Sequence, residues 1–145
     1  MKKMPYEFIE HQADVGIRAW GKTLEEAFIE GAKALFDIMV DIKKVERKDS
    51  VDIECEARDI PMLFVEWLNE LIAKADLNGM VFCDFKISEI TPVDDNVHRL
   101  KAKAFGEKLD RNKHSIKVEA KAATYFGLKY ENKDGNFYLQ CVIDL

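Results

Sequence analysis

The sequence has few of the residues that mark disulfide-rich, disordered or membrane-spanning proteins. Its 145 residues include only three cysteines, three prolines and seven glycines, a composition that argues against disorder. Cys55, Cys83 and Cys141 lie far apart and form no C-x-x-C pair, so we expect three reduced structural thiols. Residues 1–6 lack the apolar core of a signal peptide, and no apolar run is long enough to cross a bilayer. We therefore expect a cytoplasmic protein without a membrane segment.

The sequence also lacks an excess of positive charge and the common motifs of nucleotide-binding proteins and serine hydrolases. Its 22 lysines and arginines are outnumbered by 27 aspartates and glutamates, which gives a net charge of −5. A protein that holds a phosphate backbone by itself needs basic residues to neutralise it, so we expect no stable direct binding of nucleic acid. No P-loop, G-x-G-x-x-G or G-x-S-x-G is present, which disfavours nucleotide binding by this chain alone and serine nucleophile chemistry.

What is present is the pattern of a single α+β domain that covers residues 1–145. Apolar residues recur at helical spacing over 23–40 and 59–78. The first of these helices begins at a capping box formed by Thr23 and Glu26. We expect both helices to pack on one side of a largely antiparallel or mixed sheet of about seven to eight strands.

Alternation of apolar and polar residues, which is typical of half-buried strands, predicts where the sheet lies. The expected strands are 6–9, 15–20, 51–57, 80–90, 100–104, 116–122, 127–131 and 137–145. Residues 91–96 are expected to form a turn, 106–112 a polar loop and 132–136 the turn of a hairpin. Gly31 lies inside the first helix, where glycine costs about 1 kcal/mol relative to alanine. That cost is tolerable if the helix lies close to the sheet at this point.

The main candidate functional residues are acidic and lie near the two ends of the sequence. Asp14 precedes a predicted strand, and Asp144 comes just before the last residue, Leu145. If the last strand lies beside Asp14, the two carboxylates and the α-carboxylate form an oxygen-lined site. Such a site suits Ca²⁺, Mg²⁺ or Mn²⁺ rather than zinc. On the spacing alone, a solvated charge beside a chain end is the commoner situation.

The three histidines do not form a pattern typical of a zinc site. His11 lies closest to Asp14, and we expect it to support that loop through a hydrogen bond rather than to bind the metal. His98 and His114 are far apart and near no cysteine pattern, which disfavours zinc.

Several segments of the sequence occur in the order found in one known family. They are His11-x-Ala13-Asp14-Val15-Gly16-Ile17-x-Ala19-Trp20-Gly21 with Leu24-Glu25-Glu26-Ala27-Phe28, then Trp67-Leu68-Asn69-Glu70-Leu71, then Lys121-Ala122-Ala123-Thr124-Tyr125 with Gly127-Leu128, and finally Val142-Ile143-Asp144-Leu145. Together they resemble archease, a family of small proteins that activate tRNA-splicing RNA ligases of the RtcB type. The resemblance extends from Tyr6 to the last residue. Gln12 and Phe126 depart from it, since many members have Thr and His there, and Phe126 disfavours a proton-carrying role at its position.

The resemblance implies a divalent cation, most often calcium, held by Asp14, Asp144 and Leu145. It also implies that Lys121 matters for activating the ligase, although strand alternation alone assigns this lysine to solvent. The implied function is an accessory one. The chain would dock on an RtcB-type RNA ligase and promote guanylylation of the ligase by GTP, which allows repeated turnover in the joining of tRNA exons. On this interpretation the chain is not itself an enzyme.

Two other functions are compatible with the same residues. A small metal-dependent phosphoester hydrolase could use Asp14 and Asp144 to position water, and it would turn over substrate without a partner. A general chaperone-like binding module would act on unrelated clients and would not depend on Asp14.

Overall fold

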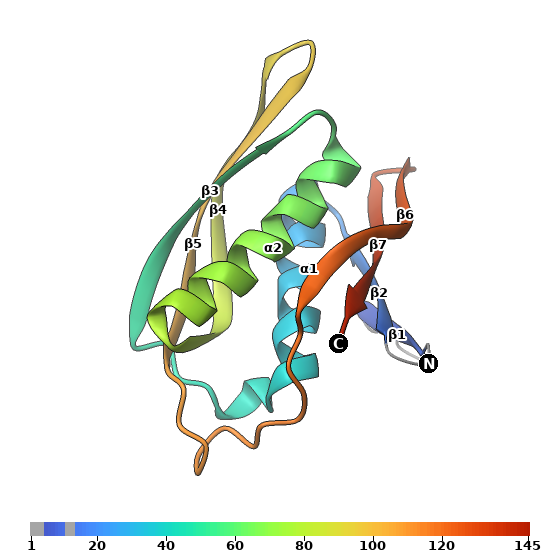
Figure 1. Cartoon of the computed structure of the whole chain (residues 1–145). Coiled ribbons are helices and arrows are strands. Elements are labelled where there is room, and N and C mark those ends of the chain that lie inside the picture. The colour runs from blue at the N-terminus through green and yellow to red at the C-terminus, as the bar shows by residue number, and fades with distance from the viewer. Residues whose placement is uncertain (1–4, 11–13) are drawn as a thin grey trace.

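The computed structural model describes residues 5–10 and 14–145, which form three layers with the helices held between two antiparallel sheets (Figure 1). The elements are β1 (Tyr6–Glu10), β2 (Asp14–Gly21), α1 (Leu24–Met39), a 3₁₀ turn η1 (Ile42–Lys44), β3 (Asp49–Ala57), α2 (Ile60–Asn78), β4 (Met80–Asp94), β5 (Val97–Lys108), β6 (Ala122–Lys133) and β7 (Asn136–Asp144). Within these residues the strand orders are β1-β2-β7-β6 and β3-β5-β4. The expected α+β class is confirmed, with two helices and antiparallel strands. The strands are divided between two sheets rather than joined in one.

Helix α1 contacts both sheets because its apolar surface is wide. Its start matches the sequence prediction: Oγ1 of Thr23 accepts the N–H of Glu26 at 3.1 Å, and the Glu26 carboxylate accepts the N–H of Lys22 at 2.9 Å. The buried residues of the helix are Ala27, Phe28, Gly31, Ala32, Ala34, Leu35, Phe36 and Ile38. At 3.6 residues per turn they cover about half of the circumference. The helix therefore packs on β2 and β7 on one side and on β4 on the other.

Gly31 marks a close approach of the two helices rather than of a helix and the sheet. A Cβ atom at Gly31 would lie 2.4 Å from the ring of Phe64 on α2, whereas the nearest sheet atom, the Cβ of Ala19, would be 3.8 Å away. A second contact lies nearby, where the indole N–H of Trp67 donates to the carbonyl of Phe28 at 2.9 Å. The missing side chain thus lets α2 pack directly on α1.

Both strands of the β4–β5 hairpin are longer than the sequence predicts. The predicted turn at 91–96 is wrong for residues 91–94, because β4 continues to Asp94, whose register partner on β5 is Val97. Similarly, β5 continues to Lys108 where a polar loop is expected, because its last residues remain paired with the start of β4. The long hairpin extends beyond the helical layer (Figure 1).

Residues 116–121 do not form the predicted strand. They belong to an irregular segment, residues 109–121, which we name the strap. The strap passes beneath the C-terminal ends of both helices (Figure 1, orange). The N–H of Lys117 on the strap donates to the carbonyl of Met39 at the end of α1, at 2.8 Å. The alternating apolar residues of the strap face a cavity between it and the helix ends. Alternation here reflects contact with helices and not the pleat of a sheet.

The three cysteines, all of which lie in the described ranges, are unpaired thiols, as predicted. Burial raises the pKa of Cys141 and, together with nearby carboxylates, that of Cys55 to about 12. Both thiols therefore stay protonated at neutral pH, which fits a structural role. Among the residues described, neither helix has the length and apolar content needed to cross a membrane.

Candidate functional site

The candidate site lies at one end of the sheet β1-β2-β7-β6, where three segments far apart in sequence meet. Asp14 begins β2 and is the direct register partner of Asp144 at the end of β7. On the other side of β7, Asp144 is paired with Ala122. Its carbonyl also accepts the N–H of Lys121 at 2.8 Å. The central position of β7 thus brings both acidic residues and the candidate lysine to the same strand end.

The two carboxylates form an unfavourable pair when no cation is shared between them. Directly opposed residues of an antiparallel pair have Cβ atoms about 4.5–5.5 Å apart, and like charges at such positions destabilise the sheet. Asp14 and Asp144 are both half-buried. In the described part of the chain, neither carboxylate has a hydrogen-bond or ion-pair partner. A cation bound between them would convert this repulsion into attraction.

The available donors fit a hard divalent ion. Carboxylate oxygens suit calcium, magnesium and manganese, whereas zinc sites are usually built from cysteine and histidine. No point within residues 5–10 and 14–145 gathers three or more His, Cys, Asp or Glu side chains. A cation at Asp14 and Asp144 therefore needs further oxygens, for which the half-buried Leu145 and water are candidates. The supporting role predicted for His11 concerns a residue outside the described ranges.

Lys121 lies where the strap joins β6, with its side chain exposed. The sequence pattern assigned this side chain to solvent correctly. The pattern contained no sign that the backbone of the same residue is bonded to Asp144. Lys121 also lines the cavity of about 590 Å³ between the strap and the helix ends. The lysine is therefore held at its backbone while its side chain borders both solvent and this cavity.

Asn69 on α2 also belongs to the site, although no sequence pattern assigned it a role. Its Nδ2 donates to the carbonyl of Ala123 at 3.0 Å, and its Oδ1 accepts the N–H of the same residue at 2.8 Å. Ala123 lies on β6, an edge strand of its sheet. Asn69 thus satisfies both backbone groups that the edge would otherwise expose at this point. The available signal was the place of Asn69 in the segment Trp67-Leu68-Asn69-Glu70-Leu71, which carries part of the family resemblance.

Further along β6 a bulge presents two aromatic side chains to solvent. The register with β7 shifts between Thr124 and Lys129, and Gly127 within this stretch has a φ of +65°. The side chain of Phe126 is 71% exposed, while the hydroxyl of Tyr125 donates to Glu66 on α2. Residue 126 thus faces solvent, and a phenylalanine side chain has no group that can accept or donate a proton.

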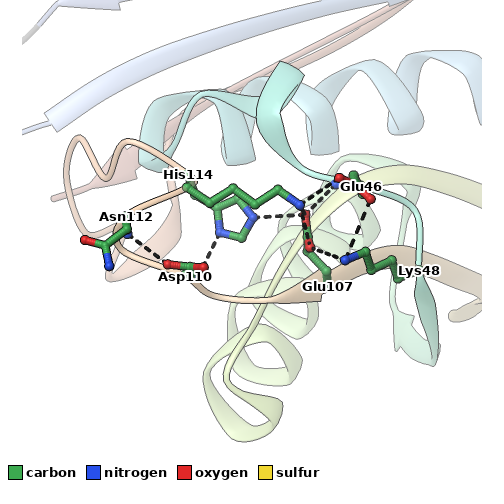
Figure 2. Close-up of polar contacts among 7 residues, drawn as sticks. Glu46, Lys48, Glu107, Asp110, Asn112 and His114 are labelled. Carbon is green, nitrogen blue, oxygen red and sulfur yellow. Dashed lines mark hydrogen bonds and ion pairs between the residues drawn. The ribbon is translucent and has the colours of Figure 1, made fainter.

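A polar cluster around the buried Glu107 and His114 fixes the strap to the end of β5 (Figure 2). The Glu107 carboxylate accepts the N–H of Glu46 at 2.7 Å and the ammonium of Lys113 at 2.9 Å. It also lies 3.0 Å from Nε2 of His114, which is fully buried. The N–H of Asp110 donates to Nδ1 of His114 at 2.9 Å, so the ring proton is assigned to Nε2, which donates to Glu107. Both ring nitrogens are therefore occupied, and His114 acts in structure rather than as a metal ligand.

Glu107 makes the stability of the strap depend on pH. Hydrogen bonds from the Glu46 N–H and from Lys113 lower the pKa of Glu107 from 4.5 to about 2. A folded-state pKa below the unfolded value means that this stabilisation is complete above about pH 4.5 and is lost as pH falls towards 2. We expect Glu107→Gln to lower the free energy of unfolding at pH 7 by about 1–3 kcal/mol, because one of the two accepting oxygens becomes an N–H₂ group that cannot accept from the surrounding donors. Urea unfolding at pH 7 and pH 3 measures this.

The matched control for this experiment is Glu119→Gln, which neutralises an exposed carboxylate on the same strap. It should leave the free energy of unfolding nearly unchanged. The difference between wild type and Glu107→Gln should shrink at the lower pH, where the wild-type carboxylate begins to take up a proton. A difference of the same size at both pH values would show that the charge of Glu107 contributes nothing.

Fold and site together define a class of small α+β proteins. Two helices lie between antiparallel sheets, and two paired carboxylates lie at the same end of two neighbouring strands. The archease protein family model matches residues 6–145, and the chain belongs to this family. It is 45% identical to the protein archease of Pyrococcus furiosus over 141 residues, which cover 97% of this chain and 98% of that protein. It is 38% identical to the protein archease of Methanopyrus kandleri, over 98% of this chain and all of that protein.

Two solved structures share the fold. The solution structure of Methanobacterium thermoautotrophicum protein 1598 superposes with a TM-score of 0.82 at 31% identity, and the match covers 97% of this chain and 99% of the other. A Thermotoga maritima crystal structure, described as an archease and possible chaperone, superposes with a TM-score of 0.60 at 20% identity. That match covers the whole of this chain and 98% of the other, and at this identity it supports the fold alone.

Proposed function

We propose that this chain is a non-catalytic accessory protein that activates an RtcB-type RNA ligase. It promotes GTP-dependent guanylylation of the ligase and so allows repeated joining of tRNA exons. Membership of the archease family supports the accessory role. The observation that carries the proposal is the meeting of Asp14, Asp144 and Lys121 at one strand end.

The residues of this strand end have distinct roles in the proposed mechanism. Asp14 and Asp144, with oxygens from Leu145, hold a divalent cation, for which calcium is the first candidate. When bound, such an ion supplies concentrated positive charge that attracts phosphates and carboxylates. Lys121 adds a further positive charge, and its backbone bond to Asp144 keeps it beside the acidic pair. The site thereby offers fixed charges that orient groups of the ligase's nucleotide site before transfer.

The charge pattern on the outer face of the sheet β3-β5-β4 supports a protein partner rather than direct binding of RNA. Exposed cations of the central strand are paired with carboxylates of the neighbouring strand: Arg99 with Glu56 and Lys103 with Asp52, at 2.8 and 2.9 Å. Such exposed pairs add little stability. They do neutralise one another, which leaves little positive potential on this face for a phosphate backbone. In the proposed complex the ligase holds the RNA.

Single-turnover guanylylation of the cognate ligase by GTP tests the proposal. Wild-type chain should accelerate the step. Asp14→Ala, Asp144→Ala and Lys121→Ala should each reduce that acceleration by about a hundredfold, which is typical for removal of one preorganised electrostatic group. Lys129→Ala is the matched control, because it removes an exposed lysine from β6, the strand that directly follows Lys121. It should retain the wild-type rate.

Other outcomes separate the competing functions. A wild-type chain that leaves the guanylylation rate unchanged contradicts the activator role. Equal acceleration by wild type and all three site variants contradicts the assignment of the site. Turnover of phosphoesters by the chain with a divalent cation and no ligase identifies a hydrolase. Protection of unrelated client proteins that does not depend on Asp14 identifies a general chaperone-like module.

A further inference from the structure

The contact between Asn69 and Ala123 reproduces the bonding of a neighbouring β-strand with a single side chain. A strand neighbour supplies one donor and one acceptor to each paired residue, and the amide of Asn69 supplies both, at 3.0 and 2.8 Å. Asparagine and glutamine are the side chains that offer an N–H₂ donor and a carbonyl acceptor together in one group. The bonds are partly buried, so the loss of either partner leaves a backbone group poorly satisfied.

The pair of hydrogen bonds between Asn69 and Ala123, which we name the clamp, lies where the irregular strap ends and strand β6 begins. Ala123 is paired with Ile143 of β7 on one side and is held by Asn69 of α2 on the other. Two residues earlier, the N–H of Lys121 donates to the carbonyl of Asp144. On the strap side, the nearest backbone bond is that of Lys117 to the end of α1. After Lys121 along the chain, the clamp is thus the first hydrogen-bonded contact that the backbone makes with a residue outside the sheet.

We propose that Asn69 is a positioning residue that keeps Lys121 beside the acidic pair. Asn69 touches neither carboxylate. It holds the start of β6 between α2 and β7, so that the Lys121 N–H stays on Asp144 and the lysine side chain leaves the backbone at a fixed place. The consequence for activation rests on the proposed function, whereas the consequence for the Lys121 backbone does not.

Hydrogen exchange of the Lys121 amide, followed by NMR, tests the backbone consequence directly. This amide is bonded to Asp144 and not to Asn69, so a change in its exchange reports the coupling between the two contacts. Asn69→Leu should speed its exchange about tenfold, because the free energy of local opening falls by the contribution of one to two net hydrogen bonds. Asn69→Asp retains the acceptor but loses the donor, and it should give a smaller increase.

Asn78→Leu is the matched control, because it removes an amide of the same helix whose Nδ2 donates to Lys74 within that helix, at 2.8 Å. It should leave Lys121 exchange at the wild-type rate. The proposal is overturned if Lys121 exchanges within about twofold of wild type in Asn69→Leu, since such a change is smaller than one net hydrogen bond. It is also overturned if Asn78→Leu speeds this exchange as much, because the effect would then be one of general stability.

The guanylylation assay gives a second test through a double-mutant comparison. Asn69→Leu should reduce the acceleration of the ligase in the wild-type background and should reduce it no further in the Lys121→Ala background. A role confined to general stability predicts the same fractional loss in both backgrounds, and that result contradicts the positioning role. If Lys121→Ala alone has no effect, the proposed function of the site fails. The exchange measurement still decides whether Asn69 positions the Lys121 backbone.

Discussion

Gly106→Ala is expected to destabilise the protein by more than about 3 kcal/mol, at the upper end of the cost of overpacking a core. Gly106 is buried on β5, next to the bulge between Phe82 and Asp84 of β4. A Cβ atom there would lie 1.9 Å from the carbonyl oxygen of Val81 and 2.8 Å from the Cα of Phe82. Both atoms belong to the backbone, so no side-chain rotation can relieve the clash. Guanidinium chloride unfolding of the two proteins measures the difference.

Gly31→Ala serves as the control for this substitution. Its added methyl would also collide, but with the buried ring of Phe64 rather than with backbone atoms. The change from glycine to alanine within a helix recovers about 1 kcal/mol. The destabilisation by Gly31→Ala should therefore be clearly smaller than that by Gly106→Ala. A cost below about 1 kcal/mol for Gly106→Ala would show that β4 and β5 can separate at the bulge with little loss of pairing energy.

The elements that follow from the sequence are those fixed by local chemistry. Thr23 and Asp59 begin the two helices through side-chain bonds to the first-turn N–H groups, and Gly79 ends α2 with a φ of +60°. Each of these signals needs only three or four neighbouring residues, so one sequence is enough to read it. The pairing of Asp14 with Asp144 is different. Its prediction came from the resemblance, since nothing in either segment alone specifies the register of β2 and β7.

The features that could not be predicted depend on which surfaces meet. The alternation over 116–121 has the period of a strand, but it arises because the strap lies along the ends of two helices. Two sheets form instead of one because α1 is apolar over about half of its circumference, with Ala34 and Phe36 at the two edges of its buried face. The partner of Asn69 is the backbone of Ala123, 54 residues further along the chain. Only the packed structure reveals such a partner.

A divalent cation should stabilise the wild-type protein, while Asp14→Asn should remove this effect and stabilise the cation-free protein. The reason is the sign of the interaction between Asp14 and Asp144, which are direct register partners. Without a cation the two like charges repel, so neutralising one of them raises the free energy of unfolding. With a cation the wild-type pair gains binding energy in the folded state only. That gain is about 2.7 kcal/mol at a cation concentration one hundred times the dissociation constant.

Thermal unfolding of both proteins, in chelator and in calcium, shows the predicted reversal. In calcium the wild-type midpoint should rise by roughly 5–10 °C for a chain of this size. Asp14→Asn should start above wild type in chelator and should barely respond. Asp95→Asn, which neutralises an exposed carboxylate in the β4–β5 turn, should respond like wild type. Equal shifts of the unfolding midpoint by calcium in wild type and Asp14→Asn would place the cation elsewhere. A lower midpoint for Asp14→Asn than for wild type in chelator would mean that the two carboxylates do not repel. Magnesium, manganese and zinc in the same assay then rank the ions, with zinc expected last because the donors are oxygens.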